Sequence, residues 1–230
     1  MYRIGKRVIS QFIRTGCRRR LRLDLYAGKS DRARGDAPEK DASRPGLALL
    51  TEQGRQYERE KYHELEAVFP GLVIHGASKA FAAGEICAFT DLSLADYIDA
   101  LEPDQFVLEA QFDVTSSFRQ AHNLLDLEDG SAVADGQPLT FDALRPDILQ
   151  ARPPGAVPRR IITPSGRIER IAREDPRLGL RVIDIKISGE ASPAHFSELA
   201  YYGMALAAWL EDTGRAGRFV VLAEAAIWPG

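Results

Sequence analysis

The sequence predicts an α/β domain with a mixed central β-sheet flanked by helices. The 230 residues are 45% hydrophobic, which is enough for a sizeable core. Short β-branched or alternating apolar runs are separated by segments with helical spacing, and the C-terminal half has the order strand, strand, helix, strand. We expect a single domain over residues 1–230. The apolar strand that stops abruptly at Pro229-Gly230 is also compatible with a part of a larger protein.

Composition excludes several classes of protein. Lys and Arg total 30 against 33 Asp and Glu, a formal net charge of -3, so any polyanion must be met by a local basic surface. Two cysteines, Cys17 and Cys87, cannot form a disulfide framework, a four-thiolate zinc site or an all-cysteine iron–sulfur cluster. The sequence contains no apolar run long enough to span a membrane and no secretory signal. These features predict a cytoplasmic protein without a membrane partner.

The N-terminal segment is basic. Residues 1–22 contain eight Arg or Lys and no acid, with apolar residues at helical spacing beneath the charges. Three interpretations are open: an organellar transit peptide, a solvated helix face, or a basic face that contacts phosphates. We favour the phosphate-contacting face, and its arginines are Arg14, Arg18, Arg19 and Arg20.

A loop and a long helix follow. Residues 27–46 are small, charged and interrupted by Pro and Gly, and they contain too few apolar groups to offset their ordering entropy. We expect a mobile loop there. The spacing over residues 47–69 then predicts a helix, which Pro70-Gly71 ends.

The next part of the chain alternates between strand and helix signals. Apolar runs with a period of two predict strands or buried segments, and one helix is expected among them. The strands are expected at residues 72–77, 80–89 and 106–114, and the helix at residues 92–101. Glu109 and Gln111, on the last of these strands, are more plausible as strand-surface residues than as part of a site.

Charge is segregated in the second half of the chain. Residues 91–142 carry twelve acids and one base, whereas residues 143–186 carry ten bases and five acids. A solvated surface explains the acidic block as well as a function does. For the basic block we favour a phosphate contact, because it includes the two carboxylates described below. Its Pro-rich part, residues 150–180, predicts a long loop or a small hairpin.

An acid and a lysine emerge side by side from a predicted core strand. Residues 181–187 form a β-branched run whose period of two places Asp184 and Lys186 on one face and isoleucines on the other. Burial of either charge alone is costly, so the two groups must pair, hold a cation or face a cleft. Taken by itself, this tripeptide is best explained by a structural ion pair.

A second carboxylate changes that interpretation. Asp147 follows Pro146 in another short apolar strand. Two carboxylates on adjacent strands bind a hard cation through oxygen, and such a cation polarises a phosphate and lowers the pKa of a bound water. A lysine beside them orients that water or offsets charge on the phosphorane. The pattern is the one that a divalent-metal phosphodiesterase needs.

Five short motifs, spread over most of the chain, resemble those of the PD-(D/E)XK nuclease superfamily, in particular its RecB-like branch with CRISPR-associated and helicase-linked nucleases. The opening "VISQFIRTGCRRRLRLDLY" is similar to the first helix of that family, and "EQGRQYERE" to its Gly-x-x-x-(His/Glu) helix. "LRPDIL" matches the Pro-Asp motif and "VIDIKIS" the (D/E)-x-K motif. "PAHFSELAYYGMAL" resembles the Gln-x-x-x-Tyr helix.

The resemblance implies a restriction-endonuclease-like core and a deoxyribonuclease that uses Mg²⁺ or Mn²⁺. It implies a role in DNA repair, recombination or defence against foreign DNA, beside a helicase or another subunit of such a system. Asp147 and Asp184 would be the main metal ligands, Glu58 a third ligand and the carbonyl of Ile185 a further one, with Lys186 as the catalytic lysine. DNA would be contacted by Arg14, Arg18, Arg19, Arg20, Arg145, Glu198 and Tyr202. We expect the N-terminal arginines, Arg145 and part of the 152–173 segment to rim the cleft.

Two departures from the family pattern affect this expectation. The chain lacks the late cysteines that hold an iron–sulfur cluster in several RecB-like proteins, so we expect no cluster and a buried structural thiol at Cys17. Glu198 stands where the family has glutamine, which either weakens the substrate contact or adds a cation ligand. A nucleic-acid-binding or scaffolding module that does not cut therefore stays as an alternative, as does an unrelated α/β domain with a structural Asp184–Lys186 pair.

Overall fold

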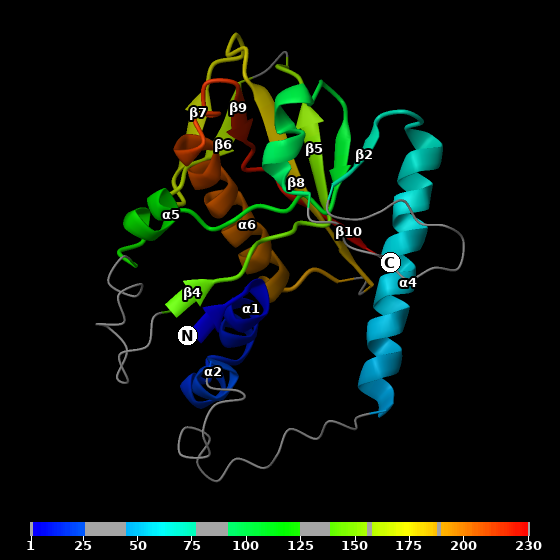
Figure 1. The fold of residues 1–230 in the computed structure, drawn as a ribbon, viewed down its shortest axis with the longest axis vertical. Helices are drawn as coiled ribbons and strands as arrows, with labels where there is room; N and C mark the ends of the chain where they lie inside the picture. The colour runs from blue at the N-terminus through cyan, green and yellow to red at the C-terminus, as the bar shows by residue number, and fades with distance from the viewer. Residues whose placement is uncertain are drawn as a thin grey trace.

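Figure 1 shows a computed structural model of the chain, in which residues 2–25, 45–76, 92–124, 139–155, 158–187 and 190–229 are described. The predicted fold class is confirmed, because a sheet with parallel and antiparallel strands is flanked by helices. The loop expected at 27–46 lies outside the described residues except where a helix begins at Pro45. The strand expected at 80–89 lies wholly outside them. None of the described helices combines the length and apolarity that crossing a bilayer requires.

The described part of the central sheet has the strand order β10-β8-β5-β3-β2, and β9 pairs with the first residues of β8. β5 is antiparallel to both β3 and β8, whereas the β2–β3, β8–β9 and β8–β10 pairs are parallel. The β-branched run predicted as a core strand is β8, which has neighbours on both sides. The strands are β2 (Val73–His75), β3 (Phe106–Leu108), β5 (Ile148–Arg152), β8 (Leu178–Lys186), β9 (Phe219–Val221) and β10 (Ala226–Pro229).

Two long helices cover the two faces of the sheet (Figure 1). α4 (Pro45–Val68) packs Tyr62 and Leu65 against the isoleucine face of β8, as the period of two predicts. α6 (Pro193–Asp212) covers the other face and buries most of its length in the larger core. Ser192 and His195 cap its N-terminus reciprocally.

The N-terminal elements pack beside α6. β1 (Tyr2–Ile4) pairs in parallel with β4 (Leu139–Phe141), α1 (Lys6–Thr15) contacts α6, and α2 (Arg18–Leu25) lies next to α1. Cys17 is exposed, so the expectation of a buried thiol was wrong. The reason is local: Gly16 ends α1 in the left-handed conformation, and the residue after it lies outside both helices. There the Cys17 sulfur accepts a 3.4 Å hydrogen bond from Arg20 N.

The structure also tests three other expectations about local structure. Residues 92–101 form two short 3₁₀ helices, η1 (Leu94–Asp96) and η2 (Ile98–Ala100), because their backbone hydrogen bonds span three residues. The 150–180 segment contains a hairpin, β6 (Arg159–Ile162) with β7 (Ile168–Ile171), which confirms the second of the two options for it. The strand expected over 106–114 stops at Leu108, because Glu109 has a φ of 53°.

Candidate active site

The register of β5 and β8 brings the two predicted aspartates together. Ile148 lies opposite Ile183, and Asp147 and Asp184 occupy the next position of the same antiparallel register. Leu149 and Val182, two residues further into the strands, both belong to the core on the α6 side. Side chains two residues apart share a face of a sheet, so Asp147 and Asp184 are directed to that side too. Both are buried, with exposed fractions of 6% and 0%.

Asp147 is held in place by the backbone of the neighbouring strand. Its Oδ2 accepts a 2.6 Å hydrogen bond from Ile185 N. β5 begins only at Ile148, so this carboxylate occupies the place of a strand partner for that amide. On the other side, the Asp147 carbonyl accepts a 3.0 Å hydrogen bond from Glu109 N. Asp147 therefore links three adjacent segments at the end of the sheet.

Asp184 faces a lysine and has an unsatisfied oxygen. Its Oδ2 is 2.7 Å from Lys186 Nζ, while its buried Oδ1 has no hydrogen-bond partner among the described residues. Burial and the charge of Asp147 raise the pKa of Asp184 to about 7, against the lowering effect of Lys186 and Lys6. Burial lowers the pKa of Lys186, but the carboxylates of Asp184, Asp147 and Glu198 together outweigh burial, and the net shift is upward. Lys186 is thus a cation at neutral pH.

α6 contributes the two residues that its motif predicts. Glu198 Oε2 lies 3.3 Å from Lys186 Nζ, so the residue in the glutamine position contacts the predicted catalytic lysine. Tyr202, one turn later, is fully buried and donates a 3.0 Å hydrogen bond to the Arg145 carbonyl. Both side chains therefore face the Asp147–Asp184 end of the sheet. Tyr202 supports the segment that leads into β5.

α4 directs Glu58 to the same group of charges. Glu58 is partly buried and lies one turn before Tyr62. Burial raises the pKa of Glu58, the charges of Lys6 and Lys186 oppose that rise, and Asp184 adds to it. The predicted third acid is therefore electrostatically coupled to the site. Among the described residues, however, no three acidic, histidine or cysteine side chains stand as a group that could hold a metal ion.

Lys6 belongs to this cluster and was missed by sequence reasoning. It is the first residue of α1, and its Nζ lies 5.2 Å from the centroid of the Tyr202 ring. Burial lowers the pKa of Lys6, but Asp147, Tyr202 and Asp184 together raise it above its ordinary value. No spacing in the sequence relates this lysine to the aspartates. Its position depends on the packing of α1 against α6.

Glu109 is the second group that the sequence reasoning misplaced. Its left-handed φ of 53° is costly for a residue with a side chain and ends β3. Its carboxylate is buried and accepts a 3.0 Å hydrogen bond from the Tyr62 hydroxyl. Gly76 permits this bend, because a Cβ there would lie 2.9 Å from the Glu109 carbonyl oxygen. The sequence did contain one signal for this role: Glu109 is an acid within an otherwise apolar run that the structure shows to be buried.

The predicted DNA-contacting arginines are divided between two places. Arg14 on α1 and the three arginines that begin α2 are exposed, on helices that extend away from Lys6. Arg145 is partly buried and its charge lowers the pKa of Glu109 against the effect of burial, so it faces the cluster. The described residues of the 152–173 segment do not rim the site. Arg152 pairs with Gly179, about 16 Å along the strands from Asp147 and Asp184, and Figure 1 shows the β6–β7 hairpin at the opposite end from α2.

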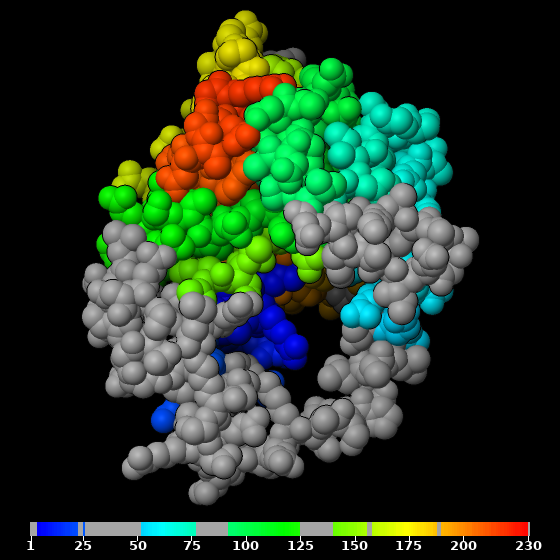
Figure 2. Space-filling view, viewed as in Figure 1, coloured from blue at the N-terminus to red at the C-terminus, as the bar shows by residue number. Residues whose placement is uncertain are grey.

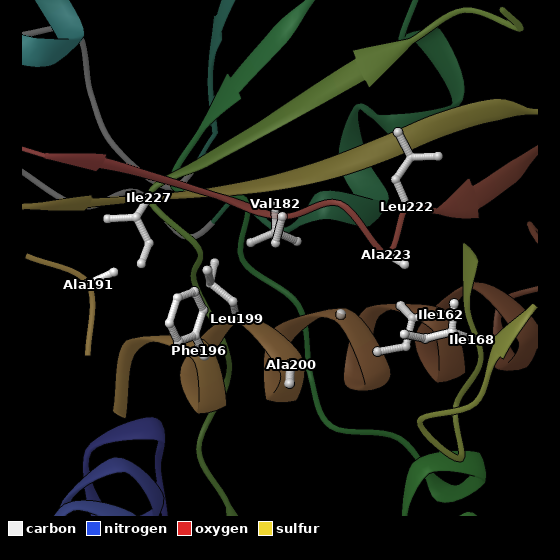
Figure 3. Close-up of a pocket in the computed structure, with 12 residues that line it drawn as sticks. Ile162, Ile168, Val182, Ala191, Phe196, Leu199, Ala200, Leu222, Ala223 and Ile227 are labelled. Carbon is white, nitrogen blue, oxygen red and sulfur yellow. The ribbon is translucent and has the colours of Figure 1, made fainter. Parts of the chain in front are cut away.

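Figure 2 shows an opening between α1 (blue) and α4 (cyan), with part of α6 (brown) visible at its back. Between α6 and the sheet lies an apolar groove of about 460 Å³, drawn in Figure 3. Val182 and Ile227 form its sheet wall and Phe196 and Leu199 its helix wall. Val182 precedes Asp184 on one face of β8, so this groove begins beside the site and contributes no charged group to it.

The donor set fits a hard divalent cation. Carboxylate oxygens are the ligands that Mg²⁺ and Mn²⁺ prefer, and the Oδ1 atom of Asp184 is buried without a hydrogen bond among the described residues. Such an atom is costly unless a cation or a donor meets it. Carboxylates also outnumber ammonium groups here; they belong to Glu58, Glu109, Asp147, Asp184 and Glu198, against Lys6 and Lys186. The fit to a divalent cation depends on the Asp147–Asp184 pair and does not require that all ligands already surround an empty site.

No protein-family model, no curated protein and no solved structure matches this chain. Functional inference therefore depends on the contacts described above and on the motifs in the sequence. Of these, the β5–β8 register is the most specific, because it brings Asp147 and Asp184 together although they lie far apart in the chain.

The raised pKa of Asp184 predicts how stability depends on pH when no divalent cation is present. A carboxyl whose folded-state pKa is about 7 favours folding below its unfolded value near 3.8, and this contribution is lost as pH rises through 7. Asp184→Asn keeps the neutral form. With chelator at pH 8 it should raise the free energy of unfolding by about 1–3 kcal/mol, a gain reduced by the loss of the Lys186 pair. At pH 5 the gain should be less than half as large, and it should vanish only near pH 4, where the unfolded carboxyl is also protonated.

Denaturant titration at both pH values measures this difference. The exposed Asp99 is the matched control, because Arg215 lowers its pKa and Asp99→Asn should give no gain at pH 8. An Asp184→Asn variant that is less stable than the parent at pH 8 would contradict the assignment of Asp184 as an unfavourably buried charge.

Proposed function

We propose that this protein is a Mg²⁺- or Mn²⁺-dependent nuclease of the PD-(D/E)XK superfamily, RecB-like branch, which hydrolyses phosphodiester bonds in DNA. One observation carries the proposal: the strand register sets Asp147 opposite Asp184 at the end of the sheet, and Lys186 Nζ lies 2.7 Å from Asp184. Two buried carboxylates with a lysine beside them suit a site that binds a cation and a phosphate.

Each side chain has a role in this proposal. Asp147 and Asp184 would hold the cation, with Glu58 and the Ile185 carbonyl as further ligands. When bound, the cation would polarise the phosphate and lower the pKa of a water. Lys186, whose pKa is raised, would orient that water or offset the charge that develops on the phosphate. The hydrogen bond from Ile185 N to Asp147 holds the first carboxylate rigidly for this task.

The biological setting follows from the resemblance alone. RecB-like nucleases imply DNA repair, recombination or defence against foreign DNA, with a helicase or another subunit of that system as partner. We propose such a setting, in the cytoplasm, for this chain. A basic approach for DNA is available on α1 and α2, whose exposed arginines extend from the Lys6 end of the site.

One observation favours a second candidate, a module that binds nucleic acid without cutting it. Glu198 Oε2 lies 3.3 Å from Lys186 Nζ, so the lysine charge is shared between Asp184 and Glu198. A lysine held by two carboxylates is less available to a phosphate. The two candidates differ in a single measurable property, which is hydrolysis.

Cleavage of linear DNA is the direct test of the nuclease proposal. The parent should cut in Mg²⁺ or Mn²⁺ and lose activity in chelator. Asp147→Asn, Asp184→Asn and Lys186→Gln should each reduce the rate at least 100-fold, on the scale of removing one electrostatic group from an active site, with DNA binding largely retained. Lys61→Gln, which changes a lysine on α4 beside Glu64, should cut like the parent.

Three results would contradict the nuclease assignment: cutting that persists in chelator, an Asp184→Asn variant with full activity, or a folded parent that binds DNA without hydrolysing it under any of these conditions. The last result would support the non-cutting module. Glu198→Gln then separates the causes, because restored cutting would identify the Glu198–Lys186 pair as the inhibiting feature.

Salt dependence tests the route by which DNA approaches. Binding to phosphates releases counterions, so removal of one arginine–phosphate interaction flattens the slope of log affinity against log salt by about one unit. Arg18/Arg19/Arg20→Ala should bind DNA more weakly, with a shallower slope, for every sequence tested. The control is Arg160/Arg167/Arg170→Ala on the hairpin, which lies away from the site and should bind like the parent. The opposite ranking of the two variants would move the DNA path to the hairpin.

A further inference from the structure

Lys6 occupies an unusual position for a lysine at the start of a helix. Its ammonium group lies over the Tyr202 ring at 5.2 Å, and the side chain is partly buried. Tyr202 itself is fixed by its hydrogen bond to the Arg145 carbonyl, two residues before Asp147. Lys6 is thus held against the segment that carries the first aspartate.

The charge of Lys6 acts on four acids around that segment. It opposes the effect of burial on the carboxyl groups of Glu58, Glu109, Asp147 and Asp184. Lys186 is not equivalent, because it is engaged by Asp184 at 2.7 Å and Glu198 at 3.3 Å. Lys6 is therefore the cation that is available to Asp147 from the α1 side.

A buried cluster of carboxylates needs a compensating positive charge when no metal ion is bound. Lys6 reaches the cluster only because α1 packs along α6, so tertiary structure has placed a lysine there that local sequence does not require. The same cluster is the one that fits a divalent cation. Lys6 and that cation interact with the same carboxylates, and their like charges repel.

We propose that Lys6 is the resident counter-ion of the carboxylate cluster, which competes electrostatically with the divalent cation for Asp147 and its neighbours. This inference rests on the proposed cation site and adds a form of regulation to it. Lys6 stabilises the cation-free protein and weakens cation binding until substrate is present. A DNA phosphate that enters the site then supplies the negative charge that Lys6 and the cation share.

Removal of the Lys6 charge should consequently strengthen cation binding. A folded Lys6→Gln protein should bind Mn²⁺ about 10-fold more tightly than the parent in the absence of DNA, the order expected when one nearby like charge is removed at an effective dielectric constant of about 20. Lys6→Arg keeps the charge and should bind Mn²⁺ like the parent. Electron paramagnetic resonance of free Mn²⁺, or calorimetry, measures these affinities without any catalytic readout.

Controls separate this effect from a structural one. Lys61→Gln removes a lysine that contacts the Tyr57 and Trp228 rings on the α4 side of the sheet and should leave Mn²⁺ affinity unchanged. If Lys6→Gln does not fold, Lys6→Met keeps the aliphatic stem against Tyr202 and makes the same test. If Lys6 had only a structural role, its replacement would lower the melting temperature, and the Mn²⁺ affinity of the variant would be equal to or weaker than that of the parent.

The outcomes distinguish this inference from the proposed function. Tighter Mn²⁺ binding by the neutral variants supports it, and equal or weaker binding by a folded neutral variant overturns it even if the parent cuts DNA. If the neutral variants bind Mn²⁺ more tightly than the parent but the parent does not cut DNA, only the nuclease proposal is overturned. A parent that binds no Mn²⁺ at millimolar concentration overturns both the counter-ion role and the cation site.

Discussion

The candidate site depends on the pairing of β5 with β8. The hydrogen bond from Ile185 N to Asp147 Oδ2 is the last contact of this pairing. The bond lets a side chain replace a backbone partner at the start of β5, so Asp147 is fixed where the strand pairing ends. Asp184 is then the residue directly opposite. A shift of the register by one residue would turn Asp184 toward α4 and away from Lys6 and Glu198.

Charge compensation explains why so many elements meet at this end of the sheet. Isolated buried carboxylates are strongly unfavourable, and here the opposing charges come from Lys186 on β8, Lys6 on α1 and Arg145 before β5. The compensation is incomplete, because Asp184 retains a pKa of about 7 and an oxygen without a hydrogen bond among the described residues. Sites that carry such an electrostatic cost are commonly those that bind or react.

Sequence reasoning predicted the parts of this arrangement that local patterns determine. The β-branched run placed Asp184 and Lys186 on one face of a core strand, and the order strand, strand, helix, strand predicted α6 after it. It failed where position depends on distant packing: Lys6 enters the site through the packing of α1 on α6, and Glu109 through a left-handed bend. The basic hairpin was misplaced because its charge pattern gives no information about which end of β8 it adjoins.

The central claim is that the oxygens of Asp147 and Asp184 form a divalent-cation site at the end of the β5–β8 pair. Crystals grown with Mn²⁺ test it most directly, because anomalous scattering locates the ion without reference to activity. The account predicts an anomalous peak within about 2.0–2.6 Å of a carboxylate oxygen of each aspartate. A well-ordered structure in saturating Mn²⁺ with no peak between these two carboxylates, or with the ion bound elsewhere, would contradict it.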